Sequence, residues 1–117
     1  MIERYNPGPR YSDATLFNGV LYLVEVPAIT EGDIRAQTKS MLDALESTLA
    51  LAGTRRDRLL MATIYLVDMA DYAGMNEVWE SWLPPACAPA RACVQVAGLA
   101  QPGWRVEIAV TAAYGLD

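Results

Sequence analysis

The run Leu59–Val67 (LLMATIYLV) narrows the possible folds of this chain more than any other segment. It is rich in residues that favour strands and is apolar on both faces, which is typical of a central strand covered on each side. Segments with helical spacing precede and follow it in the chain. The sequence therefore predicts a sheet with helices packed against it.

Two strands are predicted before the first helix, at 12–17 and 20–26. Asn18-Gly19 between them is a strong signal for a tight hairpin turn, and Pro27 stops the second strand. The helix is expected to begin after Thr30-Glu31-Gly32-Asp33, interpreted as a capping box, and to end before Gly53. Its apolar face has helical spacing: Ile34, Thr38, Met41, Leu42, Leu45 and Leu49.

A second helix is predicted after the central strand, with Asp68 or Asp71 as its N-cap and Pro84-Pro85 as its end. The side chains of its apolar stripe are expected to fill the core: Tyr72, Met75, Val78, Trp79 and Trp82. Two further strands are predicted at 90–97 and 104–113. The short basic run Arg55, Arg56 and Arg58 is interpreted as a solvated loop.

The predicted fold is an α+β two-layer sandwich in the order ββαβαββ, with a mixed sheet and two helices on one of its faces. The length of 117 residues indicates one domain, 1–117. The strand at 20–26 is expected to turn four side chains toward the helices: Val20, Tyr22, Val24 and Val26. The open face would then carry the following residues: Leu21, Leu23, Glu25, Tyr65, Cys93, Ala109 and Thr111. Such an apolar face predicts burial against other copies of the chain.

Composition excludes several classes of function. The chain has 9 Lys and Arg against 14 Asp and Glu, a net charge of -5, which argues against nucleic acid as a partner. It has no histidine, which excludes Ser-His and Cys-His nucleophile pairs and most zinc sites. No membrane span or signal peptide is recognised, so a cytoplasmic location without disulfides is expected.

The stretch 88–96 (APARACVQV) places a guanidinium beside a thiol at the start of a strand. Strand alternation puts Arg91 and Cys93 on one face and Ala92 and Val94 on the other. An arginine at this position suits the binding of a carboxylate, because its guanidinium offers two parallel donors. Without further information, an ion pair at the surface or an interface is the more common role for such an arginine.

Three segments together resemble the signature of a known family: Asn76-Glu77-Val78-Trp79, the run 89–96 and Val106-Glu107-Ile108. They resemble the Rid family of reactive intermediate deaminases, also called the YjgF family. The resemblance implies a fold similar to chorismate mutase and a homotrimer with sites in the clefts between subunits. It also implies hydrolysis of 2-imino acids and their enamine tautomers to 2-keto acids and ammonia, with no cofactor and no metal.

The resemblance assigns roles that the chemistry of the residues supports. Arg91 would hold the substrate carboxylate, and Glu107 would orient or deprotonate a water. Cys93 would bind through its backbone, and its thiol is not expected to be the nucleophile. The alternative for Glu107 is a structural ion pair with Arg105 or with a neighbouring subunit.

The chain departs from the family pattern at two places near its N-terminus. Leu23 stands where many members have a serine, so one hydrogen bond to the substrate is in doubt. The family's Gly-Pro-Tyr is Gly8-Pro9-Arg10 here, followed by Tyr11. We expect Arg10, Tyr11 and Leu23 to line the substrate-binding pocket, with Arg10 as a second cation.

Three functions remain open from the sequence. The leading one is an imine and enamine deaminase acting on a small carboxylated intermediate. The second is a pathway-specific enzyme of the same fold, acting on a larger enamine such as an aminomuconate or catalysing a chorismate-mutase-like rearrangement. The third is a non-catalytic trimeric module that binds small ligands such as 2-keto acids, or partner proteins. The substrate is not predicted by the sequence.

Overall fold

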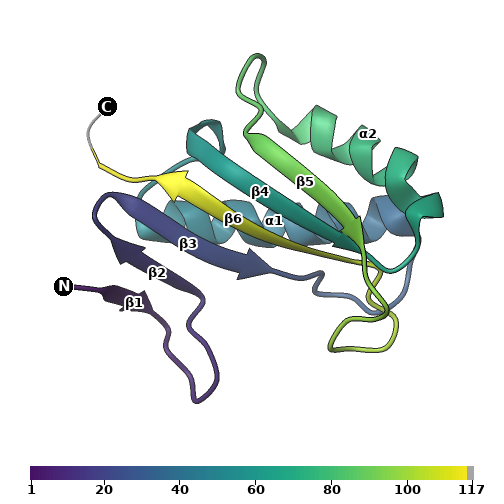
Figure 1. Cartoon of the computed structure of the whole chain (residues 1–117), viewed down its shortest axis with the longest axis horizontal. Helices are drawn as coiled ribbons and strands as arrows, with labels where there is room; N and C mark the ends of the chain where they lie inside the picture. The colour runs from purple at the N-terminus through teal and green to yellow at the C-terminus, as the bar shows by residue number, and fades with distance from the viewer. Residues whose placement is uncertain (116–117) are drawn as a thin grey trace.

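The central strand predicted at 59–67 is β4 (Leu59–Leu66), which lies between β6 and β5 in a six-stranded sheet. This computed structural model describes residues 1–115, and the order of strands across the sheet is β1-β2-β3-β6-β4-β5 (Figure 1). The other strands are β1 (Glu3–Tyr5), β2 (Ala14–Phe17), β3 (Val20–Glu25), β5 (Ala90–Gln95) and β6 (Val106–Ala113). The helices are α1 (Ile34–Ala52) and α2 (Tyr72–Trp82), with short 3-10 turns at Arg56–Arg58 and Met69–Asp71.

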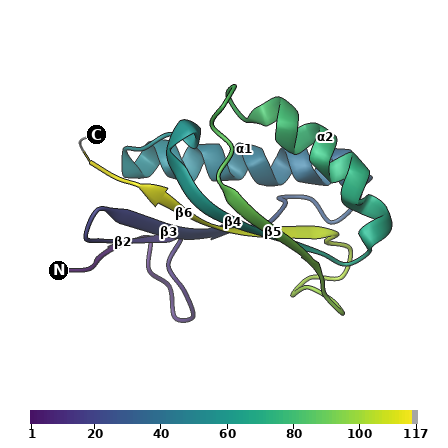
Figure 2. The same ribbon diagram turned by 45° about the horizontal axis from the view of Figure 1, so that its top comes forward.

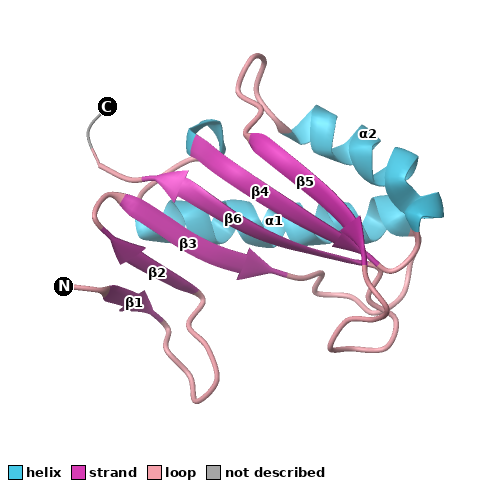
Figure 3. Ribbon diagram, viewed as in Figure 1, coloured by secondary structure: helices cyan, strands magenta, loops and turns pink. Residues whose placement is uncertain are grey.

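The predicted two-layer arrangement is confirmed. Both helices pack on one face of the sheet, and the other face carries no helix (Figures 2 and 3). The sheet is mixed because β4 and β5 run parallel, whereas each of the other neighbouring pairs is antiparallel. Strand β5 stands at the end of the strand order, so it is an edge strand with one free edge.

Both helices form where the apolar spacing predicted them. Helix α1 begins after Asp33, whose side chain accepts a hydrogen bond from the Ala36 amide at 2.9 Å, and ends at Gly53 with φ 92°. The expected capping box over 30–33 is therefore wrong, because Asp33 alone caps the helix. Asp68 caps the 3-10 turn that leads into α2, and Asp71 makes no capping bond with its side chain.

The N-terminal segment contains a strand that the sequence did not predict. Strand β1 pairs with β2 through Glu3 opposite Leu16 and Tyr5 opposite Ala14, so the order is βββαβαββ. Its three residues are too few to show an alternating pattern. Pro7, Gly8 and Pro9 lie in the following loop, which projects from the side opposite the helices (Figure 2).

The predicted orientation of β3 is wrong. Leu21 and Leu23 are 0% and 4% exposed and belong to the core, whereas Tyr22 and Val24 are 48% and 53% exposed on the open face. Pairing with β6 decides the orientation, since Leu23 lies opposite the buried Val110. Because side chains alternate along a strand, assigning one residue to the wrong face of the sheet assigns every residue of the strand to the wrong face.

One buried amide joins α1 to the loop that precedes β6. The side chain of Gln37 is fully buried, donates to the Gly103 carbonyl at 2.8 Å and accepts from the Arg105 amide at 2.7 Å. These two bonds hold the C-terminal end of the loop against the helix, and β6 begins directly after it. Among the residues described, no helix is both long and apolar enough to cross a membrane.

Candidate functional site

Arg91 lies near the start of β5 and turns toward helix α2. It lies opposite Ala62 in the parallel pairing with β4, and Ala62 is fully buried beneath the helices. Its Nη1 donates to Asn76 Oδ1 at 2.7 Å, and its Nη2 donates to the Tyr72 hydroxyl at 3.1 Å. Within residues 1–115 the guanidinium has no salt bridge to a carboxylate. A half-buried cation with neutral partners can bind an anion.

The backbone of β5 adds two further donors beside this guanidinium. The Val96 amide donates to the Leu66 carbonyl at 2.8 Å, so even-numbered residues of β5 point their backbone groups toward β4. By alternation, the amides of Arg91 and Cys93 point outward at the free edge of the sheet. The family resemblance implies a backbone role for Cys93, and an outward amide is compatible with that role, which stays a prediction.

The side chain of Cys93 is a poor nucleophile in this position. It lies opposite Ile64, on the helix face, and packs against the core, so its expected place on the open face is wrong. Burial raises the pKa of the Cys93 thiol, and the nearby Arg91 opposes this only in part. The neutral thiol is favoured, and both cysteines of the chain are free.

Glu107 lies on the open face of the sheet. It lies opposite Tyr65 on β4, between Val106 and Ile108, which are both fully buried on the helix face. Burial raises the pKa of the Glu107 carboxyl above its ordinary value. The suggested ion pair with Arg105 is not formed, because Arg105 pairs with Asp71 at 3.2 Å. In the part of the chain described, Glu107 has no ion pair, and a carboxylate of this kind can accept a proton.

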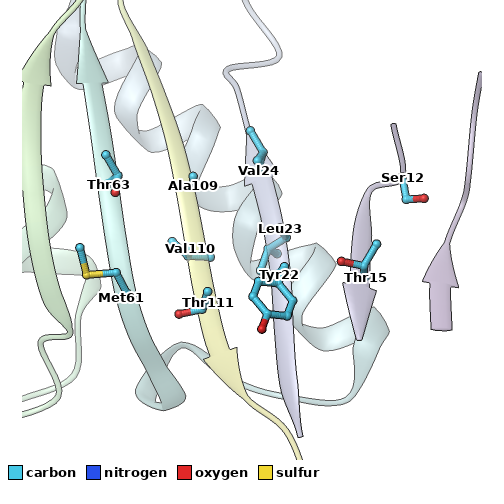
Figure 4. Close-up of a pocket in the computed structure, with 10 residues that line it drawn as sticks. All are labelled: Ser12, Thr15, Tyr22, Leu23, Val24, Met61, Thr63, Ala109, Val110 and Thr111. Carbon is cyan, nitrogen blue, oxygen red and sulfur yellow. The ribbon is translucent and has the colours of Figure 1, made fainter. Parts of the chain in front are cut away.

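A shallow hollow of about 410 Å³ lies on the same open face as Glu107 (Figure 4). Tyr22, Thr63 and Thr111 bring hydroxyl groups to it, and Met61 and Val24 form apolar walls. Ala109 lines the hollow and lies two positions beyond Glu107 on β6, so the carboxylate continues the same row of side chains. This hollow has both polar and apolar contacts to offer, and neither Arg91 nor Glu107 lines it.

The three remaining predicted site residues lie apart from Arg91. Leu23 is a core residue that borders the hollow on β3, and its side chain is buried. Arg10 and Tyr11 are exposed in the loop between β1 and β2, and Tyr11 is 75% exposed. Their neighbour Ser12 does line the hollow. Within one chain Arg10 and Tyr11 therefore lie on the open-face side, with Glu107 rather than with Arg91, whereas the Leu23 side chain points into the core.

The sequence did not identify the partners of Arg91. Tyr72 was expected in the core, but it is 39% exposed and its hydroxyl contacts the guanidinium. Asn76 follows Tyr72 by four positions on α2, so the two side chains share a helix face. This four-residue spacing, on the helix that precedes β5, was the feature of the sequence that could have indicated the partners of Arg91. Trp79, on the same face, is a core residue as expected.

Comparison with known proteins assigns the family. The family profile described as "Endoribonuclease L-PSP" matches residues 1–114. A RutC family protein of Haemophilus ducreyi is 42% identical over 97% of this chain and 97% of its own length. This chain belongs to the Rid/YjgF family. The family resemblance seen in the sequence is thereby confirmed.

Solved structures of the Rid/YjgF family share the fold of this chain. A YjgF-family protein of Neisseria meningitidis is 41% identical, with a TM-score of 0.94, over 100% of this chain and 98% of the other. A Rid-family protein of Yersinia pestis, described as of unknown function, is 31% identical, with a TM-score of 0.85, over 92% and 90%. The fold is therefore the α+β YjgF fold.

Proposed function

We propose that this Rid/YjgF protein hydrolyses 2-imino acids and their enamine tautomers to 2-keto acids and ammonia. The observation that carries the proposal is the pair of unsatisfied charges: Arg91 held by neutral groups, and Glu107 with a raised pKa and no ion pair in the part described. A 2-imino acid has a carboxylate that Arg91 can bind. It also has an electrophilic carbon that can be attacked by a water from which Glu107 removes a proton.

The two residues reach opposite faces of the sheet, so we propose that two copies of the chain complete each site. The open face carries large exposed apolar side chains, with Tyr22, Val24, Met61 and Val94 each more than 40% exposed. Burial of this face in a homotrimer would remove that apolar area from water. The β5 edge of one copy would then meet the open face of its neighbour, bringing Arg91 to the neighbour's Glu107.

In the proposed reaction, Arg91 and the outward amide of Cys93 bind the carboxylate end of the substrate. Glu107 accepts a proton from a water as the water oxygen bonds to the imine carbon, and it returns this proton to the imine nitrogen, which gives a neutral carbinolamine. The hydroxyl proton of the carbinolamine then passes to the amino nitrogen as the C–N bond breaks, so that ammonia leaves, the keto oxygen forms and Glu107 is again a carboxylate. One water is consumed and one ammonia released, and no electrons leave the substrate. General base catalysis of this type contributes about 10²- to 10⁴-fold.

A trapping experiment tests the proposal. An amino acid oxidase generates 2-iminopropionate from alanine in the presence of semicarbazide, and semicarbazone formation is followed by absorbance. The wild-type protein is expected to suppress the semicarbazone, and Arg91→Ala to lose about 10- to 100-fold of this effect, because a charge-assisted bond is removed. Arg55→Ala is the control, since Arg55 is exposed and pairs only with Asp57 among the residues described.

The result separates the proposal from the other functions left open. No effect on imines derived from alanine, leucine and glutamate, together with Arg91-dependent binding of 2-keto acids, would support the non-catalytic module instead. Activity confined to dicarboxylic imines would favour the pathway-specific enzyme, with Arg10 as the second cation on its exposed loop. Ribonuclease activity is not proposed, because the net charge of -5 provides no cationic surplus for RNA.

A further inference from the structure

The guanidinium of Arg91 is enclosed by neutral groups of a single helix face. Asn76 Oδ1 and the Tyr72 hydroxyl accept its two hydrogen bonds, at 2.7 Å and 3.1 Å. The centres of the Tyr72 and Trp79 rings lie 5.7 Å and 5.9 Å from its Cζ. At these distances the rings favour the cation without neutralising it. The contacts orient the guanidinium and leave its positive charge uncompensated.

The neutrality of these partners stands out in an acidic chain. Four of the other arginines pair with carboxylates: Arg35 with Glu77, Arg55 with Asp57, Arg56 with Glu46, and Arg105 with Asp71. Glu77 is next to Asn76 in sequence, yet its exposed carboxylate pairs with Arg35 of α1. Helix α2 therefore presents an amide to Arg91 and turns the adjacent carboxylate away from it.

The hydrogen bonds to Asn76 and Tyr72 occupy only part of the donor set of Arg91. A guanidinium has five N–H donors, and these contacts use one on Nη1 and one on Nη2. No other hydrogen bond of this side chain is formed within residues 1–115. The Nε–H and one N–H on each terminal nitrogen are left, which is enough for a two-point contact with a carboxylate.

We propose that Asn76 and Tyr72 are positioning residues, which hold Arg91 in place through neutral acceptors so that its free N–H groups bind the carboxylate of the ligand. This inference rests on the proposed function, because it assigns the carboxylate to the substrate and product. It further requires that the residue at position 76 be uncharged. A carboxylate there would pair with Arg91 and compete with the ligand for the same charge.

Asn76→Asp tests this requirement with almost no change in side-chain size. The dissociation constant for 2-oxobutanoate, a 2-keto acid of the product class, is measured by isothermal titration calorimetry. It is expected to rise at least about tenfold in Asn76→Asp, and about 3- to 10-fold in Asn76→Ala and Tyr72→Phe, since one bond to a charged group is lost. Glu77→Gln is the control, because it changes charge at the next position but does not contact Arg91.

Kinetics separate positioning from a general loss of structure. In Asn76→Ala and Tyr72→Phe, KM for the imine is expected to rise while kcat stays within about threefold of wild type, because the lost contact acts on carboxylate binding. Circular dichroism and thermal unfolding show whether each variant is folded. If Asn76→Asp fails to fold, Asn76→Ala and Tyr72→Phe decide the question by the same measurements.

The outcomes distinguish this inference from the proposed function. If Arg91→Ala abolishes binding of 2-oxobutanoate but Asn76→Asp binds it as tightly as wild type, the positioning role is wrong and the carboxylate role of Arg91 stands. A kcat loss without a KM change in Asn76→Ala also contradicts it. If the wild type neither binds 2-oxobutanoate nor hydrolyses imines, the proposed function itself fails, and the assignment of the positioning residues falls with it.

Discussion

Arg91 and Glu107 lie on opposite faces of the same sheet. Arg91 shares its row with the buried Ala62 beneath the helices, and Glu107 shares its row with Tyr65 on the open face. Strands do not bring such side chains together, because alternate residues point in opposite directions. If both act on one substrate, they belong to different copies of the chain. Catalysis by both residues would therefore require that copies of the chain assemble.

Mixed oligomers provide the test of a shared site. Arg91→Ala and Glu107→Gln, each expected to be strongly impaired alone, are unfolded together and refolded as a mixture. If a site takes Arg91 from one copy and Glu107 from its neighbour, about one site in four regains both residues in random equimolar oligomers, since each interface repeats around the ring. Imine hydrolysis by the mixture is therefore expected to return to about a quarter of the wild-type rate.

Two controls accompany the mixing experiment. Each variant is taken through the same refolding alone and is expected to gain no activity, and sedimentation analysis measures the oligomeric state of every sample. A mixture no more active than its components, with the oligomers shown to be mixed, would place both residues in the site of one chain. A monomeric wild-type protein would contradict the assembly directly.

The acid limb of the pH profile is expected to report Glu107. Burial raises the pKa of its carboxyl, so the basic form is lost as the pH falls through a value above the ordinary 4.3 or so of glutamate. The ratio kcat/KM, corrected for the uncatalysed hydrolysis of the imine, should fall on the acidic side with its midpoint above about 4.3. Glu107→Gln should lose this limb together with most of the rate.

The same shift has a consequence for stability that can be measured without substrate. A carboxyl whose pKa is raised by folding favours the folded state when protonated, so its contribution is lost as the pH rises through the raised pKa. Relative to Glu107→Gln, the free energy of unfolding of the wild type should fall as the pH rises from about 4.3. This difference between the two proteins should stop changing once the pH exceeds the pKa of Glu107 in the folded state. Glu80→Gln, at an exposed position on α2, is the control for removal of a charge.

Replacement of the Cys93 thiol is expected to leave catalysis nearly intact. Burial raises the thiol pKa, and only the backbone of Cys93 faces the free edge of the sheet. Cys93→Ala should therefore keep kcat/KM within about threefold of wild type, because one small, partly buried side chain is exchanged for another. A loss of about 10³-fold or more, in a folded and oligomeric variant, would instead assign covalent chemistry to the thiol.

The elements were predictable from the sequence, but the orientation of one strand was not. Helix α1 follows from its apolar spacing and from Gly53, whose positive φ ends the helix. In β3, by contrast, both Leu21 and Tyr22 are large and apolar, so alternation provides no contrast between the faces. Pairing with β6 decides which set is buried, and pairing over such a sequence separation is a tertiary effect.

The site was predictable as a set of residues but not as an arrangement. Alternation placed Arg91 and Cys93 on one face correctly, since both lie on the helix side of β5. The open face was expected to carry Ala109, whose row on β6 includes Glu107, and this is where Glu107 lies. Cys93 was expected on that face too, but the pairing of β5 with β4, which local patterns do not contain, places it on the helix side. Tyr72 was assigned to the core because it falls on the same predicted apolar stripe of the helix as Trp79. In the structure Trp79 is buried, whereas Tyr72 is exposed and contacts Arg91 of β5, and this difference depends on how β5 packs against α2.

The loop between β5 and β6 offers a matched pair of substitutions. Gly103 has φ 96°, and a Cβ at this position would overlap the carbonyl oxygen of Thr30. Gly98, in the same loop, has nothing within 4 Å of the place where its Cβ would lie. Gly103→Ala is therefore expected to lower the free energy of unfolding by about 2 kcal/mol or more, from the left-handed backbone and the overlap together.

Urea unfolding followed by circular dichroism measures both variants, with Gly98→Ala expected to stay within about 0.5 kcal/mol of wild type. Because the Gly103 carbonyl accepts from Gln37, displacement of this loop should also weaken the bond that holds the Arg105 amide, two residues before Glu107. Faster hydrogen exchange at the Arg105 amide in Gly103→Ala, but not in Gly98→Ala, is the expected sign. Equal stability of the two variants would show that the loop does not rely on close packing against Thr30.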